Sequence, residues 1–541
     1  MITFIAEEKD KGLTVEEFFA RQALDFTPIA YSINKEMAPH FREIQPGDFL
    51  ESYSASHKYG YAVYQRSLIF LLDRVVAELI PEGCFEMSHA ISKAIYGCFT
   101  NGMHFTEEQV RQIRERMKKM IRADLPFEGR MMTRAEALEV MRQENDRNEK
   151  WMYGTFFPEE FPVYTLAGGQ PDFNYGPLVP STGFLGSFDL RYYMPGLLLI
   201  LARRNNPGKL FEFRELPKIF DIIDDNNRIT DILDISYATG INKQIREGRG
   251  KELILIGEAL QEGKIAAIAK QINDHREKYQ LVMISGPSSS GKTTFSRKLE
   301  IALKAYGQNP ISLSLDDFYL NREDTPLDME GKPDFESLDA IDKELFQKVL
   351  ADLINGEEVE IPSFNFHTGK REYRGKKIRK APDSPLIIEG IHGLNPKLTS
   401  AVPRHLKYII YVTALTQVNL DPLTYLKTTD ARLLRRIIRD HRFRSFDAER
   451  TLSLWPSVRR GEERNIFVYQ ELADVHFNSN LPYELNVLKY YAEPYLKAVP
   501  YDSPYYMDAR HLLNILRYVE PLDDEWVPSF SVLREFIGRQ R

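Results

Sequence analysis

The segment formed by Gly286, Pro287, Ser288, Ser289, Ser290, Gly291, Lys292 and Thr293 constrains the fold of this chain more than any other stretch. It follows a continuous apolar run that ends at Ser285, and it precedes apolar residues at helical spacing that stop at Gly307. A buried strand, a glycine- and serine-rich loop and a helix in this order predict a βαβ unit whose loop backbone cradles phosphate groups. The alternative is a chance match in a flexible loop, and the flanking strand and helix argue against it.

Further apolar runs predict additional strands of the same sheet, at residues 311–315, 386–388 and 408–412. Strands that alternate with helical patterns indicate a doubly wound parallel sheet, and hence an α/β domain over residues 278–480. A chain of 541 residues is too long for one core. The pattern predicts a small α+β unit over residues 1–52, a second α+β region over 53–225, a helical linker over 226–277 and a helical extension over 481–541.

Within the second region we expect mostly helices over residues 60–150, and short strands and turns over 155–190. The helical extension ends in an arginine-rich stretch that we expect to be exposed. Thr14 and Glu17 have the spacing of a capping box that opens a helix.

Composition excludes several classes of protein. Hydrophobic residues make up 43% of the chain and charged residues 28%, which is typical of globular proteins rather than disordered ones. A net charge of −7 argues against a surface that coats DNA or a membrane. Cys84 and Cys98 are the only cysteines, too few for a disulfide framework or a thiolate metal cage. The charged start and the short apolar runs predict a cytoplasmic protein.

The loop residues indicate a site for ATP and Mg²⁺. Lys292 places a charge on the β- and γ-phosphates, and the Thr293 hydroxyl is a ligand for Mg²⁺. Asp316 and Asp317 follow one predicted strand and Glu389 follows another, so these carboxylates converge at the carboxyl edge of the sheet. There they could accept a proton from an attacking hydroxyl or hold the metal, or they could merely form turns and cap helices.

A run of arginines follows the last of these strands. Arg432, Arg435, Arg436 and Arg439 are spaced to lie on one face of a helix. Such a cluster repels itself unless an anion lies opposite, so it predicts phosphate clamping or a lid over the nucleotide. The alternative is a solvated basic face paired with Asp430 and Asp440.

Together these segments resemble the uridine kinase and phosphoribulokinase branch of P-loop kinases. The matching stretches are Gly286 to Thr294, Leu315 to Tyr319, Asp334 to Ala340, Ile361 to Phe366, Ile388 to Ile391, Asp430 to Asp440, and Ala473 with Asp474. The resemblance implies that Asp316 is the general base and that Glu389 and Asp316 hold magnesium beside Thr293. It also implies that Lys292, Arg432 and Arg435 assist transfer, that Thr294, Arg436 and Arg439 join the loop in binding ATP, and that Tyr319, Glu336, Phe364 and Arg371 contact the acceptor.

The base pocket departs from this pattern. Uridine kinases have a tyrosine and a histidine where this chain has Phe364 and Gly369. The preference for a pyrimidine is therefore open, and His367 could substitute or could be an ordinary surface residue.

The first half of the chain has a different likeness. Residues 1–52 resemble the TGS domain of threonyl-tRNA synthetases, and residues from about 60 to 225 resemble their editing domain. The stretches Phe105 to Met120 and Asp172 to Gly183 carry this resemblance. The hydrolytic residues of the editing enzymes are replaced here by Arg66, Phe70, Asn174 and Leu178, so we expect a binding, regulatory or dimerising role.

The whole arrangement, including the stretch Ser531 to Gly538, resembles bacterial uridine kinase-like nucleoside kinases. This likeness implies Mg²⁺-assisted transfer of the ATP γ-phosphate to the 5′-hydroxyl of a uridine- or cytidine-type nucleoside. The alternatives are a kinase for another small hydroxyl compound, such as a sugar phosphate, and a regulatory ATPase associated with tRNA. We expect no DNA or membrane partner, RNA binding through the first half is open, and a homo-oligomer is expected by analogy.

Overall fold

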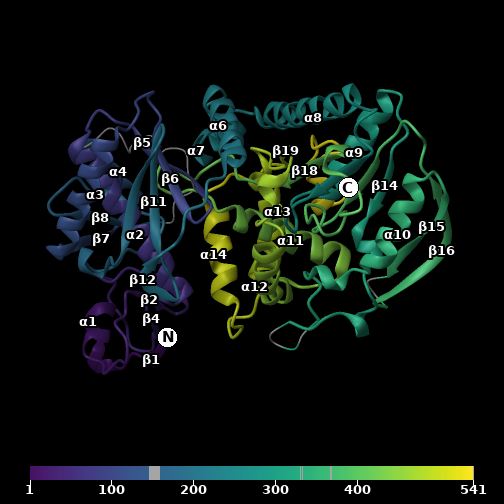
Figure 1. Ribbon diagram of the computed structural model, residues 1–541. Coiled ribbons are helices and arrows are strands. Elements are labelled where there is room, and N and C mark those ends of the chain that lie inside the picture. The colour runs from purple at the N-terminus through teal and green to yellow at the C-terminus, as the bar shows by residue number, and fades with distance from the viewer. Residues whose placement is uncertain (145–158, 329–330, 332, 366–367, 540–541) are drawn as a thin grey trace.

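The computed structural model describes residues 1–144, 159–328, 331, 333–365 and 368–539. The N-terminal regions lie on one side of the molecule and the domain that contains the phosphate loop lies on the other, with the C-terminal helices between them (Figure 1). His367, considered above for base recognition, lies outside the described residues.

The first domain is a four-stranded sheet with one helix against it. Strands β1 (Ile2–Ile5), β2 (Ala30–Ile33), β3 (Glu36–Ala38) and β4 (Phe49–Tyr53) pair in the order β1-β4-β2-β3. Helix α1 (Val15–Ala20) begins at the predicted capping box, where Thr14 and Glu17 each accept a hydrogen bond from the other's backbone N–H. Val15, Phe18 and Phe19 pack this helix onto the sheet core.

The second region surrounds a long buried helix, α2 (Lys58–Leu79). Its main sheet has the order β10-β11-β6-β5, with β12 paired to β11. A smaller sheet has the order β7-β8-β9. The elements, in chain order, are β5 (Phe85–Ile91), β6 (Ala94–Phe99), α3 (Glu107–Arg122), β7 (Phe127–Thr133), α4 (Arg134–Glu144), β8 (Glu160–Leu166), β9 (Asp172–Phe173), β10 (Phe188–Tyr193), β11 (Gly196–Arg203) and β12 (Asn206–Leu210).

The expectation of mostly helices over residues 60–150 is wrong for three strands, β5, β6 and β7. Both β5 and β6 are buried on both faces. The sequence of β6 is mostly apolar, and such a run can be a buried helix or a buried strand. Strand β5 buries the polar residues Glu86, Ser88 and His89, so its composition does not mark it as a core strand.

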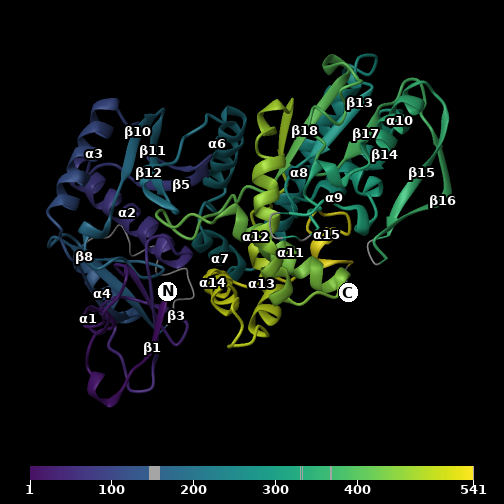
Figure 2. The same ribbon diagram turned by 60° about the horizontal axis from the view of Figure 1, so that its bottom comes forward.

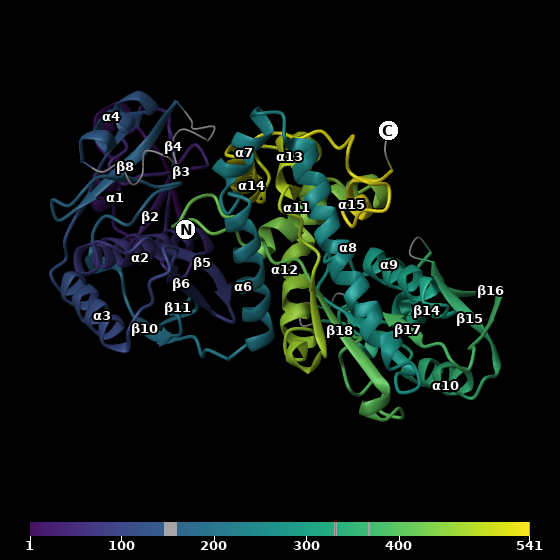
Figure 3. The same ribbon diagram turned by 90° about the horizontal axis from the view of Figure 1, so that it is seen from above.

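Three helices connect the two parts of the molecule: α6 (Pro217–Ile232), α7 (Ala238–Arg246) and α8 (Gly250–Asp274). Seen from above, α6 and α7 lie beside the N-terminal region and α8 extends across to α9 (Figure 3). Buried residues of α8, including Ile265, Ala269 and Ile272, pack against β13 and α9. The predicted helix over residues 250–277 is therefore confirmed.

The phosphate-loop domain contains the predicted parallel sheet. Strands β13 (Leu281–Ser285), β14 (Ile311–Ser314), β17 (Leu386–Glu389), β18 (Lys407–Thr413) and β19 (Val475–Asn478) pair in the order β14-β17-β13-β18-β19. All four pairings are parallel. Helices α9 (Lys292–Ala305) and α10 (Lys343–Ile354) accompany this sheet, and β15 (Glu358–Asn365) and β16 (Lys370–Arg379) form a separate hairpin at its edge (Figure 2). The α/β fold class is confirmed.

The remaining helices share a hydrophobic core of their own. They are α11 (Thr428–Arg444), α12 (Ala448–Asn465), α13 (Glu484–Lys497), α14 (Tyr506–Arg517) and the single turn α15 (Arg534–Ile537). The expectation of an exposed C-terminal stretch is wrong up to Gly538. Val532, Leu533, Phe536 and Ile537 are completely buried, because they pack into the core that α11 and α13 share.

The two parts of the molecule are docked through hydrogen bonds to one loop of the phosphate-loop domain. The Met87 N–H donates to Pro422 O at 2.7 Å, Gln65 donates to the Tyr425 hydroxyl at 2.7 Å, and the imidazole of His89 contacts Thr416 O at 2.8 Å. Among the described residues, no helix has the length and apolarity needed to cross a bilayer.

Candidate active site at the phosphate loop

The phosphate loop joins β13 to α9, and its backbone requires glycine at two positions. A Cβ on Gly286 would lie 2.0 Å from Val412 O, so no side chain fits between the loop and β18. Gly291 has φ +80° and immediately precedes α9. The first N–H groups of α9 therefore face the loop, where an anion is stabilised by these donors and by the positive end of the helix.

Lys292 and Glu389 face each other at the base of this loop. The Lys292 ammonium donates to Pro287 O at 3.0 Å, and burial lowers its pKa while Glu389 and Asp316 oppose that shift. Burial, with repulsion from Asp316, raises the pKa of Glu389 to about 7. The site thus holds one ammonium near two carboxylates, and a bound Mg²⁺ would offset the excess of negative charge.

A magnesium ion would fit beside Thr293. The Thr293 hydroxyl donates to Glu389 Oε1 at 3.3 Å, and so does the hydroxyl of Ser314 at the same distance. Mg²⁺ favours such oxygen ligands and usually keeps several waters and phosphate oxygens, with only one or two carboxylates from the protein. Thr293 and Glu389 would hold the ion, with Asp316 on the same side of the sheet.

Asp316 and Asp317 have different surroundings, although they are neighbours in the chain. Burial raises the pKa of Asp316, and the cations opposing this shift are Lys292, Arg444 and Arg439. Asp317 instead accepts the N–H of Phe364 at 3.3 Å, which ties the β15–β16 hairpin to the sheet. Asp316 is therefore the carboxylate available for chemistry, and Asp317 has a structural role.

The arginine run lies directly beneath the loop. Arg432 donates to Ser288 O at 2.9 Å, and Arg435 donates to Ser289 O at 3.2 Å. Both side chains are fully buried, Arg435 against Glu484 with two hydrogen bonds of 2.5 Å and Arg432 against Glu462. These two arginines thus support the loop from below, through its backbone carbonyl groups.

The other predicted arginines lie closer to the transfer site. Arg436 donates to the Ser288 hydroxyl at 2.8 Å and pairs with Asp440 at 3.2 Å. Arg439 also pairs with Asp440, at 3.1 Å. Arg439 and Arg444 both oppose the rise in the pKa of Asp316, so these two cations of α11 stabilise its charged form.

Three carboxylates at the loop were missed by the sequence reasoning. Glu462 accepts the N–H of Ser288 at 2.9 Å, and Glu484 pairs with Arg435. Glu535 accepts both the N–H of Thr294 at 3.1 Å and its hydroxyl at 2.8 Å. Each lies far from the loop in the chain, and no motif marks it, so only the fold brings it there.

The predicted acceptor residues lie on the hairpin side of the sheet. Tyr319 and Phe364 are in edge-to-face contact, with ring centroids 5.7 Å apart. Burial, with repulsion from Glu462, raises the pKa of Glu336 to about 7, and its buried Oε2 has no hydrogen-bond partner among the described residues. Such an atom is suited to accept a ligand hydroxyl. Arg371 pairs with Asp342 at 2.8 Å, so its guanidinium anchors β16 to the start of α10.

Gly369 explains why the base pocket departs from the uridine kinase pattern. Its φ is +69°, and a Cβ at this position would lie 2.9 Å from the side chain of Arg322. A histidine here would be strained and would also displace Arg322.

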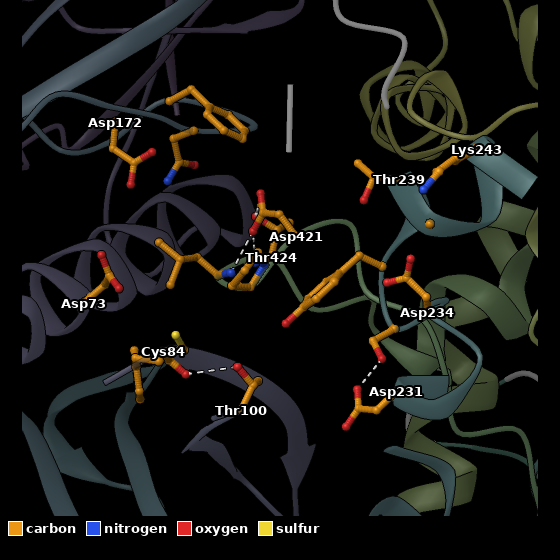
Figure 4. A pocket seen from close by; sticks show the side chains of 18 of the residues that line it. Asp73, Cys84, Thr100, Asp172, Asp231, Asp234, Thr239, Lys243, Asp421 and Thr424 are labelled. Carbon is orange, nitrogen blue, oxygen red and sulfur yellow. Dashed lines mark hydrogen bonds between the residues drawn. The ribbon is translucent and has the colours of Figure 1, made fainter. Parts of the chain in front are cut away.

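In the N-terminal region, the four residues that stand where the editing enzymes have hydrolytic side chains contribute to packing, to hydrogen bonding or to the wall of a cavity. Arg66 is half-buried and donates to Pro177 O at 2.9 Å, while Phe70 and Leu178 belong to the hydrophobic core. Asn174 lines a cavity of about 900 Å³ between this region, α7 and the loop that contains Asp421 (Figure 4). Carboxylates that line this cavity form ion pairs within the chain: Asp73 and Asp172 both pair with Arg74.

The sheet order, the phosphate loop and the acidic strand ends define the class of the C-terminal part as a P-loop domain. The model of the family described as "Phosphoribulokinase / Uridine kinase family" matches residues 281–480. The predicted resemblance of this segment to that family is confirmed.

Some individual relatives are uridine kinases, and others are threonine–tRNA ligases that match the N-terminal half. A uridine kinase of Macrococcus caseolyticus is 29% identical over 185 residues, which are 34% of this chain and 79% of the relative. A threonine–tRNA ligase of Desulforamulus reducens is 30% identical over 178 residues, 33% of this chain, and such ligases match its N-terminal half. The chain spans about a quarter of that ligase, 27% of its length. The solved D-glycerate 3-kinase of Cryptococcus neoformans has a TM-score of 0.23 and 15% identity, covering 52% of this chain and 90% of that one.

Proposed function

We propose that this protein transfers the γ-phosphate of ATP to the 5′-hydroxyl of a nucleoside. The observation that carries the proposal is the meeting of Lys292, Asp316 and Glu389 below a P-loop, in a segment that matches a kinase family. Phosphoryl transfer depends mainly on positioning and on stabilising charge, and these groups supply both.

The roles follow from the contacts. The loop N–H groups and Lys292 hold the phosphates, and Arg439 and Arg444 face the charge that spreads over the transferring group. Asp316 accepts the proton that the acceptor hydroxyl loses, and burial raises its pKa, which makes the carboxylate a stronger base. Magnesium, when bound, would neutralise charge on the β- and γ-phosphates. Glu336, with its unpartnered oxygen, would accept a hydroxyl of the acceptor's ribose.

A second candidate acceptor is a sugar phosphate or another small hydroxyl compound. Gly369 favours it, because no base-reading histidine fits there. Phe364 likewise offers no hydroxyl for reading a base.

The test is ADP release from Mg²⁺-ATP with a panel of nucleosides and sugar phosphates, beside a control without acceptor. Turnover that requires a nucleoside and yields its 5′-monophosphate would support the proposal. Turnover with sugar phosphates alone would favour the second candidate. ADP release that needs no acceptor, or only tRNA, would contradict both and indicate a regulatory ATPase.

A further inference from the structure

The C-terminal segment Ser531 to Gly538 lies against the phosphate loop. Helix α15 contacts α11 and lies beside α9 and α11 (Figure 2). The segment touches the loop itself, because a Cβ on Gly291 would be 2.5 Å from Val532 Cγ1. Arg534 fixes it in place by donating to Val527 O at 2.8 Å and by pairing with Asp524.

Glu535 occupies hydrogen-bond donors that a P-loop offers to phosphate. Its Oε2 accepts the Thr294 N–H and the Thr294 hydroxyl, at 3.1 and 2.8 Å. Thr294 is the third residue of α9, so this N–H is one of the donors that the helix itself leaves without a partner. A phosphate and the Glu535 carboxylate would be anions on the same donors, and both cannot bind there at once.

The neighbouring side chain packs against one of the arginines that support the loop from below. The ring of Phe536 lies 4.9 Å from the guanidinium of Arg435, the residue that also donates to Ser289 O. This cation–π contact links the segment to the buried support of the loop. One short segment therefore presents an anion to the loop and, one residue later, a ring to the adjoining arginine.

We propose that residues 531–538 are an internal occupant of the nucleotide site and compete with ATP for it. This inference rests on the proposed function, because it concerns regulation of the same site. In the closed arrangement the Glu535 carboxylate stands in for a phosphate and helps to balance the charge of Lys292. ATP binds when the segment withdraws from Thr294, and any partner that holds the segment away activates the enzyme.

The first test compares the full-length Glu535→Gln variant with wild type and with Glu525→Gln, an exposed carboxylate in the same C-terminal region. The readout is the Kd for Mg²⁺-ADP by isothermal titration calorimetry. Hydrogen bonds to charged groups are worth about 1.5–3 kcal/mol, so Glu535→Gln should bind at least roughly tenfold more tightly. Glu525→Gln should bind as wild type does, and equal or weaker binding by Glu535→Gln would overturn the inference.

The second test distinguishes displacement from simple charge repulsion. In the closed arrangement the N–H groups of Phe536 and Ile537 donate to Leu533 O, and that of Gly538 to Arg534 O. Hydrogen exchange of residues 531–538 in the wild-type chain should become at least tenfold faster with saturating Mg²⁺-ADP. Unchanged or slower exchange would overturn the inference and leave the proposed kinase intact. Failure of wild type and Glu535→Gln alike to bind nucleotide would overturn the proposed function, and the inference with it.

Discussion

At the scale of single residues, the site gathers buried charges of both signs around the phosphate loop. Lys292 lies among Asp316, Glu389 and Glu535, and a buried oxygen of Glu336 has no partner within the part of the chain that the structure describes. The sequence predicted Lys292, Asp316 and Glu389 because each follows a strand of a recognisable sheet. It did not predict Glu535 or Glu462, because nothing near them in the chain marks a contact with the loop.

Asp316→Asn is expected to abolish transfer while it leaves nucleotide binding intact. Asparagine keeps the size and polarity of aspartate but cannot accept the proton of the acceptor. The loss of a general base should lower kcat by roughly 10²–10⁴-fold. The measurement is steady-state transfer together with the Kd for Mg²⁺-ADP. Asp317→Asn is the matched control, and full activity of Asp316→Asn would disprove the assignment of the base.

The stability of the protein should depend on the ionisation of Glu336. Its pKa is raised from 4.5 to about 7, so the folded state favours the protonated form of this carboxyl group. The contribution of that form to the free energy of unfolding is fully present below pH 4.5 and is lost as the pH rises through 7. The shift corresponds to up to about 3 kcal/mol. Glu336→Gln should therefore gain thermal stability relative to wild type between pH 4.5 and 7. A difference in Tm that stays constant over that range would contradict the raised pKa.

At the scale of elements, α11 supports the phosphate loop from below instead of covering it. The arginines of α11 were predicted to lie on one face of the helix, where their mutual repulsion requires negatively charged groups opposite them. The structure provides these anions within the chain, from Asp440, Glu462 and Glu484. The sequence could not show this, because α12 and α13 supply Glu462 and Glu484 from 30 and 49 residues further along the chain than their arginine partners.

Arg435→Met is expected to destabilise the fold by about 3–5 kcal/mol, because it leaves the buried Glu484 carboxylate without its partner. The measurement is the shift in Tm of the full-length chain. The double variant Arg435→Met with Glu484→Met should recover most of the loss, since two apolar side chains can replace a buried ion pair. Arg439→Met, at a less buried position, is the control and should change the Tm little. A full loss that persists in the double variant would contradict a purely electrostatic cost.

At the scale of the whole molecule, the N-terminal half is docked onto the kinase-like domain through buried polar contacts. Asn419 donates to Ser88 O at 3.0 Å, next to the contact between His89 and Thr416. The segment that contains Thr416 and Asn419 leads directly into α11, the helix that supports the phosphate loop. Ligand binding at the phosphate loop and the stability of the N-terminal half are therefore expected to be linked.

Acidification should weaken this docking through His89. Burial lowers its pKa from 6.5 to about 4, so its contribution to stability is present above pH 6.5 and is lost as the pH falls towards 4. His89→Gln should therefore show a shallower fall in Tm between pH 6.5 and 4.5 than wild type. The control is His275→Gln at an exposed helix end, which should keep the wild-type slope. Equal slopes for His89→Gln and wild type would mean that His89 does not titrate on unfolding.

The sequence by itself determined the phosphate loop, the parallel sheet and the carboxylates at its strand ends, because these depend on residues close together in the chain. It also determined the capping box of α1 and the likeness of each half to a different family. Only the tertiary structure decided that β5 and β6 are buried strands, that Arg432 and Arg435 support the loop, and that Glu535 reaches Thr294. These features depend on burial and on contacts between distant segments, and local spacing carries no record of either.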